Sequence, residues 1–382
     1  MISSPLYARS LVVFGTIFLF AFCLPVSAAS VRYQDMLISP DGEYLSAVSH
    51  SDGSDTLVIL NRDTFKPNHV EAFPEDARII RHVWATDSRL IVEFERSGGH
   101  GAIPPTYTEL FALDADGGRK LLLYGINAGE RQTGSHIKKR EFARANPEIL
   151  SILPDDKNNI LIAYQPWGRT GVWEEREKIV TEINILTGRT SNFSLEAPTL
   201  GASTLTTSEG KPRFAFGTDE TGSANGYVRA GAEWQPFDLG NNRKVTPVAV
   251  SDDTLFALKD TDGERGMDAL VSYSLATGDE IQLYSSKDAQ ISTVLKPLDN
   301  GVPFGLVLEG NPKSYVFLKG GSPEKTIYKD LLGQLSGYEF RLLSADETQS
   351  HWTLSLDLGQ GKRRFYLYDS NSAELKLILA DQ

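Results

Sequence analysis

The sequence predicts an all-β fold, a seven-bladed β-propeller built of four-stranded antiparallel blades. Three observations lead to this prediction: a tight acidic turn recurs seven times, an apolar strand follows each turn, and a second hairpin then follows in most units. The acidic positions 41, 87, 155, 209, 252, 299 and 346 are separated by 46, 68, 54, 43, 47 and 47 residues. Because a four-stranded blade repeats about every 40–50 residues, most of these steps are one blade long.

The first turn shows the pattern that the others repeat. Pro40 presets φ for a turn, Asp41 can bond its own backbone, and Gly42 tolerates a positive φ. Residues 44–49 then alternate between two faces, with the period of a β-strand. The stretch 37–48 is therefore expected to be a strand, a turn and a second strand.

The later units supply the same elements. Apolar strands are expected at residues 90–94, 160–164, 254–258 and 352–356, and second hairpins at 112–118, 180–189, 270–279 and 365–371. The seven units fill residues 35–380, and residues 374–379 are expected to be the outermost strand of the last unit. No strand of the first unit is then needed to close the ring. Residues 30–382 are assigned to the propeller.

Two long connections interrupt this regularity. Residues 124–147 lie within the longest step and are expected to form a loop with one short helical turn over 139–146. Residues 165–173 form another long connection inside the third unit. Long ordered loops on a rigid scaffold are where binding residues tend to lie.

Residues 1–29 have the pattern of a secretory signal peptide. Arg9 precedes an apolar run over 11–24, Pro25 breaks this run, and small residues follow at 26–28. The alternative is an uncleaved anchor, although the run is short for a membrane span of about 20 residues. The sequence therefore predicts a periplasmic or secreted protein with no membrane span after signal cleavage.

Cysteine and charge exclude several kinds of site. Cys23 is the only cysteine and lies in the signal peptide, so the mature chain would have no disulfide, thiolate nucleophile or cysteine-ligated metal. The net charge is −12 with no concentrated basic stripe, which argues against nucleic acid as a partner. The six histidines show no metal-binding spacing, and residues 260–264 lack the later ligands of a calcium loop. We expect no cofactor and no metal.

Three stretches resemble one family. They are residues 39–42, 83–90 and 149–156, which read SPDG, VWATDSRL and ILSILPDD. They are similar to the N-terminal β-propeller of prolyl oligopeptidase-family serine peptidases, in particular acylaminoacyl- and dipeptidyl-peptidase-like members. The resemblance implies a propeller that contacts peptide substrate and gates its access. In that family an α/β-hydrolase domain with the catalytic triad follows the propeller, whereas this sequence ends at residue 382, where that domain would begin.

The sequence offers no nucleophile elbow. This motif needs Gly-x-Ser-x-Gly, and the nearest candidate, Ser336 between Gly333 and Gly337, has the wrong spacing. His100 lies in a glycine-rich loop with no visible partner for general base catalysis. We therefore expect that the chain is not an enzyme and has no catalytic residues.

Two features could bind a peptide or protein. Trp173 precedes Glu174 and Glu175, which are similar to the glutamate pair with which some dipeptidyl peptidases hold a substrate amino terminus; two adjacent carboxylates suit an ammonium group. The alternative is a solvated charge run over 174–178. Trp167 and Arg169 are residue types common among interaction anchors, although Trp167 could instead pack beneath its own loop.

These expectations define one leading function and two alternatives. The leading one is a non-catalytic periplasmic propeller that binds peptide or protein. The first alternative is a truncated or split serine peptidase whose α/β-hydrolase half is on a separate chain. The second is a scaffold propeller in an envelope complex.

Overall fold

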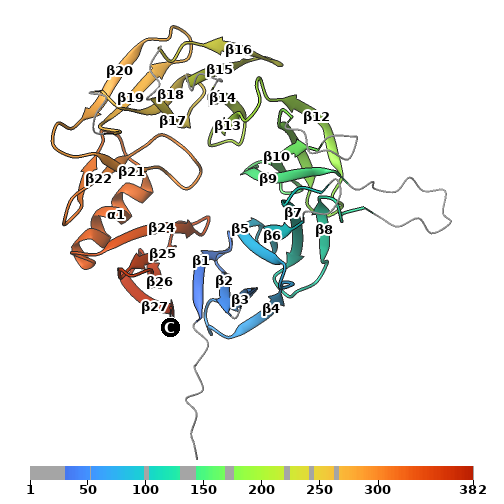
Figure 1. Ribbon diagram of the computed structural model, residues 1–382. Helices are drawn as coiled ribbons and strands as arrows, with labels where there is room; N and C mark the ends of the chain where they lie inside the picture. Colours follow the sequence, from blue (N-terminus) through green and yellow to red (C-terminus); the bar gives the residue numbers. More distant parts are fainter. Residues whose placement is uncertain are drawn as a thin grey trace, which may run out of the picture.

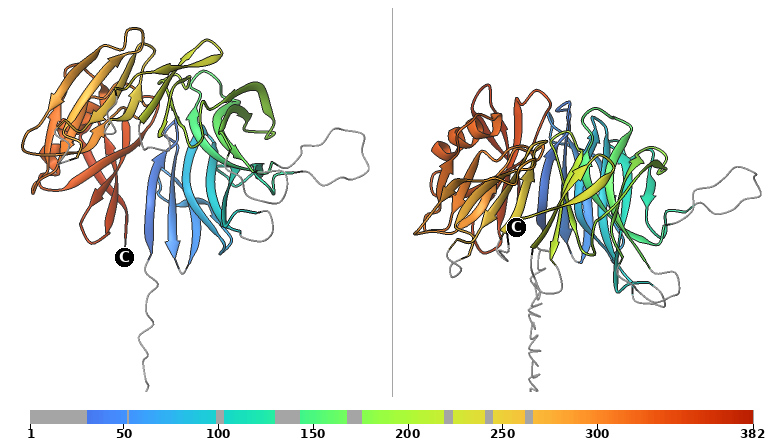
Figure 2. Two further views of the ribbon diagram at one scale, coloured as in Figure 1. Left: turned by 45° about the horizontal axis from the view of Figure 1, so that its top comes forward. Right: turned by 90° about the horizontal axis from the view of Figure 1, so that it is seen from above.

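The computed structural model describes residues 31–51, 53–98, 103–129, 143–167, 176–218, 224–240, 245–261 and 266–381. These residues form seven antiparallel sheets arranged as blades in a ring (Figure 1). Six of the blades line one cavity, and we call the space that they surround the central channel. Seen from the side, the strands run between the two faces of the ring (Figure 2). The predicted seven-bladed β-propeller is confirmed.

In each blade the strand order follows the chain order. Blade 1 consists of β1 (Arg32–Ile38), β2 (Tyr44–Ser51), β3 (Ser54–Asn61) and β4 (Pro67–Ala72). Blade 2 consists of β5 (Ala77–Thr86), β6 (Arg89–Ser97), β7 (Thr106–Asp114) and β8 (Leu121–Tyr124). Blade 3 consists of β9 (Ala145–Ile152), β10 (Asn159–Pro166), β11 (Ile179–Asn184) and β12 (Thr190–Glu196). Blade 4 consists of β13 (Ser203–Thr206), β14 (Pro212–Thr218), β15 (Ala224–Ala230) and β16 (Glu233–Phe237).

The remaining three blades complete the ring. Blade 5 consists of β17 (Val245–Val250), β18 (Thr254–Lys259), β19 (Ala269–Ser274) and β20 (Glu280–Ser285). Blade 6 consists of β21 (Ile291–Leu295), β22 (Gly305–Leu308) and β23 (Ser314–Phe317), followed by the helix α1 (Pro323–Gln334). Blade 7 consists of β24 (Glu339–Ala345), β25 (His351–Asp357), β26 (Arg363–Asp369) and β27 (Glu374–Ala380).

Every predicted acidic turn joins the first strand of a blade to the second. In the first of these turns Gly42 has a φ of 76° and its N–H donates to the Ser39 carbonyl at 2.9 Å, as expected for this turn chemistry. Turn residues from five blades line one cavity, so the turns gather at one end of the channel. We call this end the hairpin-turn face, defined by the seven turns that hold positions 41, 87, 155, 209, 252, 299 and 346.

The core lies between the blades. Second strands are largely buried because each is covered by the two neighbouring blades; β6, for example, is buried over its first six residues, Arg89 and Glu93 included. One apolar cluster joins blades 1 and 2 through Leu57, Ile79 and Leu90. Burying a side chain of this size contributes about 1.5–3 kcal/mol. Blade-to-blade packing therefore stabilises the ring.

Blade 6 departs from the prediction of four strands. Among the described residues it has three, and α1 follows in place of an outer strand. The Ser322 hydroxyl caps this helix by accepting from the Lys325 N–H at 3.2 Å, and Pro323 occupies the first turn. The buried face of α1 includes Tyr328, which stacks on Phe340 of blade 7 at 5.0 Å. The helix thus fills the space between blades 6 and 7.

The short helical turn expected over residues 139–146 is wrong for residues 145 and 146, which are in a strand. Ala145 and Asn146 begin strand β9, and β9 pairs with β10 from this end. Residues 139–142 lie outside the described residues. The strand forms because Asn146 pairs opposite Gln165, which extends the blade 3 sheet by two residues.

The last blade closes the ring with its own four strands, as predicted. Strands β1 and β27 lie side by side but belong to different sheets (Figure 1). The Asp381 carboxylate accepts from the N–H of Tyr33 at 2.7 Å and from the N–H of Arg363 at 2.9 Å. The Arg363 guanidinium donates to the carbonyls of Tyr33 and Gln34, at 2.8 and 3.0 Å. We call this contact between blades 7 and 1 the closing junction.

The signal peptide predicted at residues 1–29 lies outside the described residues. In the described part of the chain, no helix is both long enough and apolar enough to cross a membrane.

Candidate functional site

The central channel holds a cavity of about 710 Å³ at the hairpin-turn face. Its wall comes from the first strands of blades 1, 2, 3 and 7 and from turn residues of blades 4 and 6. Side chains on these strands alternate, so every second residue of a first strand can face the channel. The cavity is thus a shared site to which six blades contribute.

Part of the channel wall is apolar. Leu37, Trp84, Leu153 and Leu343 border the cavity. The Trp84 ring is 7% exposed and stacks on Tyr44, with centroids 6.1 Å apart and planes at 23°. The indole N–H of Trp84 is buried without a hydrogen-bond partner among the described residues. Trp84 therefore supports the wall from within the core of blades 1 and 2, while leucine side chains border the cavity.

The rest of the wall is charged, and the charges are paired between blades. Asp35 on β1 pairs with Arg341 on β24 at 3.1 Å. Lys157 in the β9–β10 turn pairs with Glu347 in the β24–β25 turn at 2.9 Å. The channel end thus presents both cations and carboxylates.

A third cation of the wall, Arg81 on β5, donates to the Ile149 carbonyl of blade 3 at 3.0 Å. This bond ties the guanidinium to the neighbouring blade. Arg81 keeps further N–H groups on the same guanidinium, so it can still donate to a ligand in the cavity.

His82 is a buried neutral base in this wall. Desolvation by burial lowers the pKa of its imidazole to about 4, although the nearby Asp35 charge acts in the opposite direction. Its Nε2 lies 3.0 Å from the Ser46 hydroxyl. Ser46 is fully buried, and none of the described carboxylates hydrogen-bonds His82. The Ser46–His82 pair therefore lacks the exposure and the third group of a catalytic triad.

The three other described histidines are held by carboxylates, His69 by Glu71 at 2.8 Å, and two of them border cavities. His50 Nδ1 lies 2.5 Å from Asp55, beside a cavity of about 490 Å³ between blades 1 and 2. His351 Nδ1 lies 2.7 Å from Asp346, and the Arg62 guanidinium lies 3.1 Å from the same ring. None of the three bonds a serine hydroxyl within the described ranges. The described residues also contain no cluster of three or more His, Cys, Asp or Glu that could hold a metal ion.

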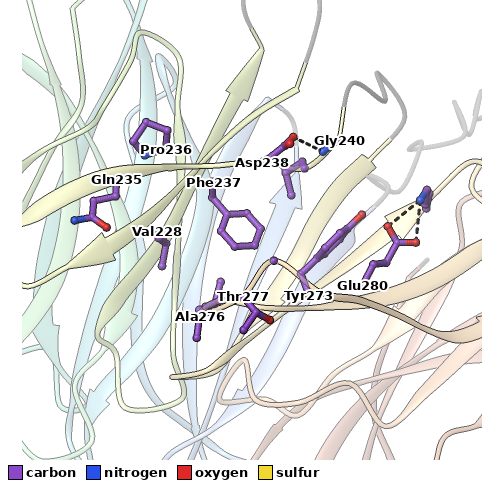
Figure 3. Close-up of a pocket in the computed structure, with 14 residues that line it drawn as sticks. Val228, Gln235, Pro236, Phe237, Asp238, Gly240, Tyr273, Ala276, Thr277 and Glu280 are labelled. Carbon is purple, nitrogen blue, oxygen red and sulfur yellow. Dashed lines mark hydrogen bonds and ion pairs between the residues drawn. The ribbon is translucent and has the colours of Figure 1, made fainter.

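A second cavity, of about 830 Å³, lies between blades 4 and 5 (Figure 3). Phe237 and Tyr273 meet edge to face in its wall, with centroids 6.3 Å apart. Lys259 and Glu280 form an ion pair beside them at 2.9 Å. Burial raises the pKa of the Tyr273 phenol well above its usual value, so this hydroxyl stays protonated.

The structure describes one of the five binding residues expected from the sequence. Trp167 is 4% exposed, donates from Nε1 to the Asn146 amide oxygen at 3.1 Å, and packs edge to face on Tyr107 at 5.9 Å. Trp167 is thus packed against blades 2 and 3, and the loop that follows it lies outside the described residues, so packing beneath that loop stays a prediction. Four other residues lie outside the described residues, and their binding role stays a prediction: Arg169, Trp173, Glu174 and Glu175.

The channel residues were not singled out by sequence reasoning. Lys157 and Glu347 lie within or beside two of the repeated acidic turns, and Trp84 lies in one of the stretches that resemble peptidase propellers. The available signal was the repeat itself. Equivalent turns of a radial fold converge at one end of the channel, so their neighbours were candidates for a shared site.

No family model matches the chain, and no curated protein matches it. Among solved structures, a prolyl endopeptidase is similar with a TM-score of 0.56 and 14% identity, covering 92% of this chain and 50% of that one. The β-propeller domain of the Trilobed protease from Pyrococcus furiosus, described as having an open velcro topology, has a TM-score of 0.53 and 10% identity, and the match covers 92% of this chain and 98% of that one. Prolyl oligopeptidase B from Galerina marginata has a TM-score of 0.56 and 10% identity, and the match covers 92% of this chain and 51% of that one.

The chain thus spans about half the length of the full peptidases that it resembles. It matches nearly the whole of a propeller domain taken by itself. At these identities the likeness concerns the fold. The chain has the fold of the propeller domains of prolyl oligopeptidase-family peptidases.

Proposed function

We propose that this protein is a non-catalytic periplasmic β-propeller whose central channel binds an extended segment of a peptide or protein. The observation that carries the proposal is the cavity of about 710 Å³ at the hairpin-turn face. Its volume lies within the range of about 300–1,000 Å³ that is typical of ligand sites. Its wall offers apolar surface for side chains, and cations and carboxylates for the polar backbone and chain ends.

Two further observations support the proposal. The similar peptidases act on peptides, and one of them is described in complex with a 25mer substrate. The sequence lacks Gly-x-Ser-x-Gly, and the described histidines lack a bonded serine apart from the buried Ser46–His82 pair. Binding without hydrolysis fits both observations.

The binding test uses the chain recovered from the periplasm of cells that express all 382 residues. Fluorescence anisotropy would measure binding of a pool of fluorescein-labelled random peptides. Ser208, an exposed turn residue that borders the cavity, is replaced by Trp to cover the channel end. Ser191, exposed on β12 far from the channel residues, is replaced by Trp as the matched control.

We expect saturable binding to the wild-type chain and to S191W, and at least tenfold weaker binding to S208W, because blocking a site removes about 1.4 kcal/mol or more of binding free energy. Equal affinities of the three proteins would contradict a channel site. Peptide hydrolysis that persists at constant specific activity through purification would contradict the non-catalytic role. A chain that stays in the cytoplasm with residues 1–29 intact would contradict the periplasmic location.

A second candidate is the propeller half of a peptidase whose hydrolase half is a separate chain. The likeness to the propeller halves of two-domain peptidases favours it. Affinity purification of the tagged chain from its native cells, followed by mass spectrometry, distinguishes the candidates. A co-purifying α/β-hydrolase supports the split peptidase, whereas a co-purifying envelope protein supports a scaffold.

A further inference from the structure

An ion pair crosses the channel end at the hairpin-turn face. Lys157 belongs to blade 3 and Glu347 to blade 7, and their Nζ and Oε1 atoms are 2.9 Å apart. Blades 1 and 2 lie between them on the shorter way around the ring, and blades 4, 5 and 6 on the longer way (Figure 1). Both side chains also line the cavity. The pair therefore spans the opening and does not follow its rim.

Both side chains stand on well-fixed turns. The Asp156 carboxylate accepts from the N–H groups of Asn158 and Asn159, at 2.9 and 3.2 Å, which holds the backbone on either side of Lys157. The Glu347 N–H donates to the Pro40 carbonyl of blade 1 at 2.7 Å. The pair can therefore open by side-chain rotation while the backbone of both turns stays in place.

The pair is weak enough to open often. The side chains of Lys157 and Glu347 are 60% and 61% exposed. The hydrogen bond that Lys157 donates to Glu347 raises the pKa of the Lys157 ammonium, and the more distant Asp87 adds to this, so the ammonium is charged at neutral pH. Exposed ion pairs contribute only about 0.2–1 kcal/mol and weaken with salt.

We propose that Lys157 and Glu347 form a strap that closes the hairpin-turn end of the channel, and that solutes enter from this face only while the strap is open. This inference rests on the proposed function only for the identity of the solute, a peptide segment. The strap itself limits access for any molecule too large to pass beside it. Breaking the pair should therefore speed entry without changing the residues deeper in the channel.

The test measures access without a peptide. The chain has no cysteine other than Cys23, so a single cysteine at Ser151, which lines the cavity, gives a specific label in the processed protein. The labelling rate of S151C with a bulky maleimide is compared with that of S151C/E347Q. The matched control is S151C/E209Q, because Glu209 pairs with Lys211 within one turn of blade 4 and crosses nothing.

We expect E347Q to raise the labelling rate about two- to fivefold, the ratio that corresponds to a few tenths to 1 kcal/mol. High salt should raise the rate of S151C by a similar factor and leave S151C/E347Q unchanged. The swapped pair K157E/E347K should return the slow rate. Equal rates for S151C and S151C/E347Q at both salt concentrations would overturn the strap.

This result is independent of peptide binding. A rate that responds to E347Q together with no peptide affinity would keep the strap and reject the proposed function. Peptide binding with equal association rates in wild type and E347Q, together with an unresponsive labelling rate, would keep the proposed function and reject the strap.

Discussion

Buried apolar clusters join blades 7 and 1 at the closing junction and blades 4 and 5 at theirs, but the two junctions differ in their hydrogen bonds. At the closing junction, Arg363 and Asp381 bind the backbone of β1 through three hydrogen bonds, and a fourth, from the Arg363 N–H, holds the Asp381 carboxylate to β26. The junction of blades 4 and 5 depends on an aromatic cluster around Phe214, Phe237 and Tyr273, next to a cavity of about 830 Å³.

The difference follows from chain connectivity. Blade 5 follows blade 4 along the chain, so a short connection joins them and bringing the two blades together costs little closure entropy. Blades 7 and 1 are far apart along the chain, and no strand is shared between their sheets. Where the ring closes without a covalent link, hydrogen bonds from Arg363 and Asp381 to the β1 backbone add to the apolar packing.

The strongest test of this contrast is the substitution F237A. The Phe237 ring packs edge to face on Phe214 at 5.6 Å and on Tyr273 at 6.3 Å. We expect the free energy of unfolding to fall by about 3–4 kcal/mol, near the lower end for Phe→Ala because the ring already borders a cavity. Urea denaturation measures this, with V70A on the exposed face of β4 as the control that should change little. A loss below about 1 kcal/mol would mean that packing does not hold this junction.

The buried His82 imidazole, at the junction of blades 1 and 2, is expected to change the free energy of unfolding by an intermediate amount. His82 has a folded-state pKa of about 4, below the unfolded value of 6.5. As the pH falls below 6.5, the unfolded chain takes up a proton that the folded chain excludes, so stability is lost between pH 6.5 and pH 4. The loss reaches about 3 kcal/mol. Stability curves of wild type and H82Q over this range should differ in slope, and parallel curves would contradict the neutral buried imidazole.

The substitution R363A tests the closing junction directly. It removes two charged hydrogen bonds and leaves the carbonyls of Tyr33 and Gln34 without this donor. We expect a loss of about 2 kcal/mol, reduced from the sum of two such bonds because the site is only partly buried. The comparison R213A removes the bond from Nε to the Asp252 carbonyl, between blades 4 and 5, and a bond to the Arg229 carbonyl within blade 4. Only one of its two bonds crosses a junction, so we expect a loss of about 1 kcal/mol. Similar losses for both arginines would remove the contrast between the junctions.

The smallest effect compares two buried tryptophans. Trp352 donates from Nε1 to the Gln349 carbonyl at 2.8 Å, whereas the Trp84 N–H has no partner among the described residues. Replacing each tryptophan by Phe removes a similar ring area, but only W352F removes a hydrogen bond that the folded protein makes. We expect W352F to cost about 1 kcal/mol more than W84F in thermal or urea unfolding. An equal cost would show that the Trp84 N–H is satisfied in solution.

Local chemistry allowed the blades to be predicted. A turn such as 39–42 is specified by its own residues, so seven turns gave the number of blades and the position of each first hairpin. The helix α1 also has local signals, Ser322 before Pro323 and Glu324. The helix was not predicted because the regular step of 47 residues fits a four-stranded blade, and three strands with a helix of 12 residues occupy the same length.

The candidate site could not be predicted in the same way. The pairing of Lys157 with Glu347 depends on which blades face each other across the ring, and this is a property of the closed ring that no single repeat contains. The burial of Trp167 depends in the same way on Tyr107, a residue of the preceding blade. Non-local pairs need the three-dimensional arrangement, whereas turns do not.

The closing junction has a consequence for protein engineering. The Tyr33 N–H and the Asp381 carboxylate are 2.7 Å apart, so the first and last strands end next to each other. A short glycine linker could join these ends, and new termini could be placed in the connection between blades 4 and 5. Such a circular permutant would keep every sheet intact. It would move the chain ends from the closing junction to the junction between blades 4 and 5.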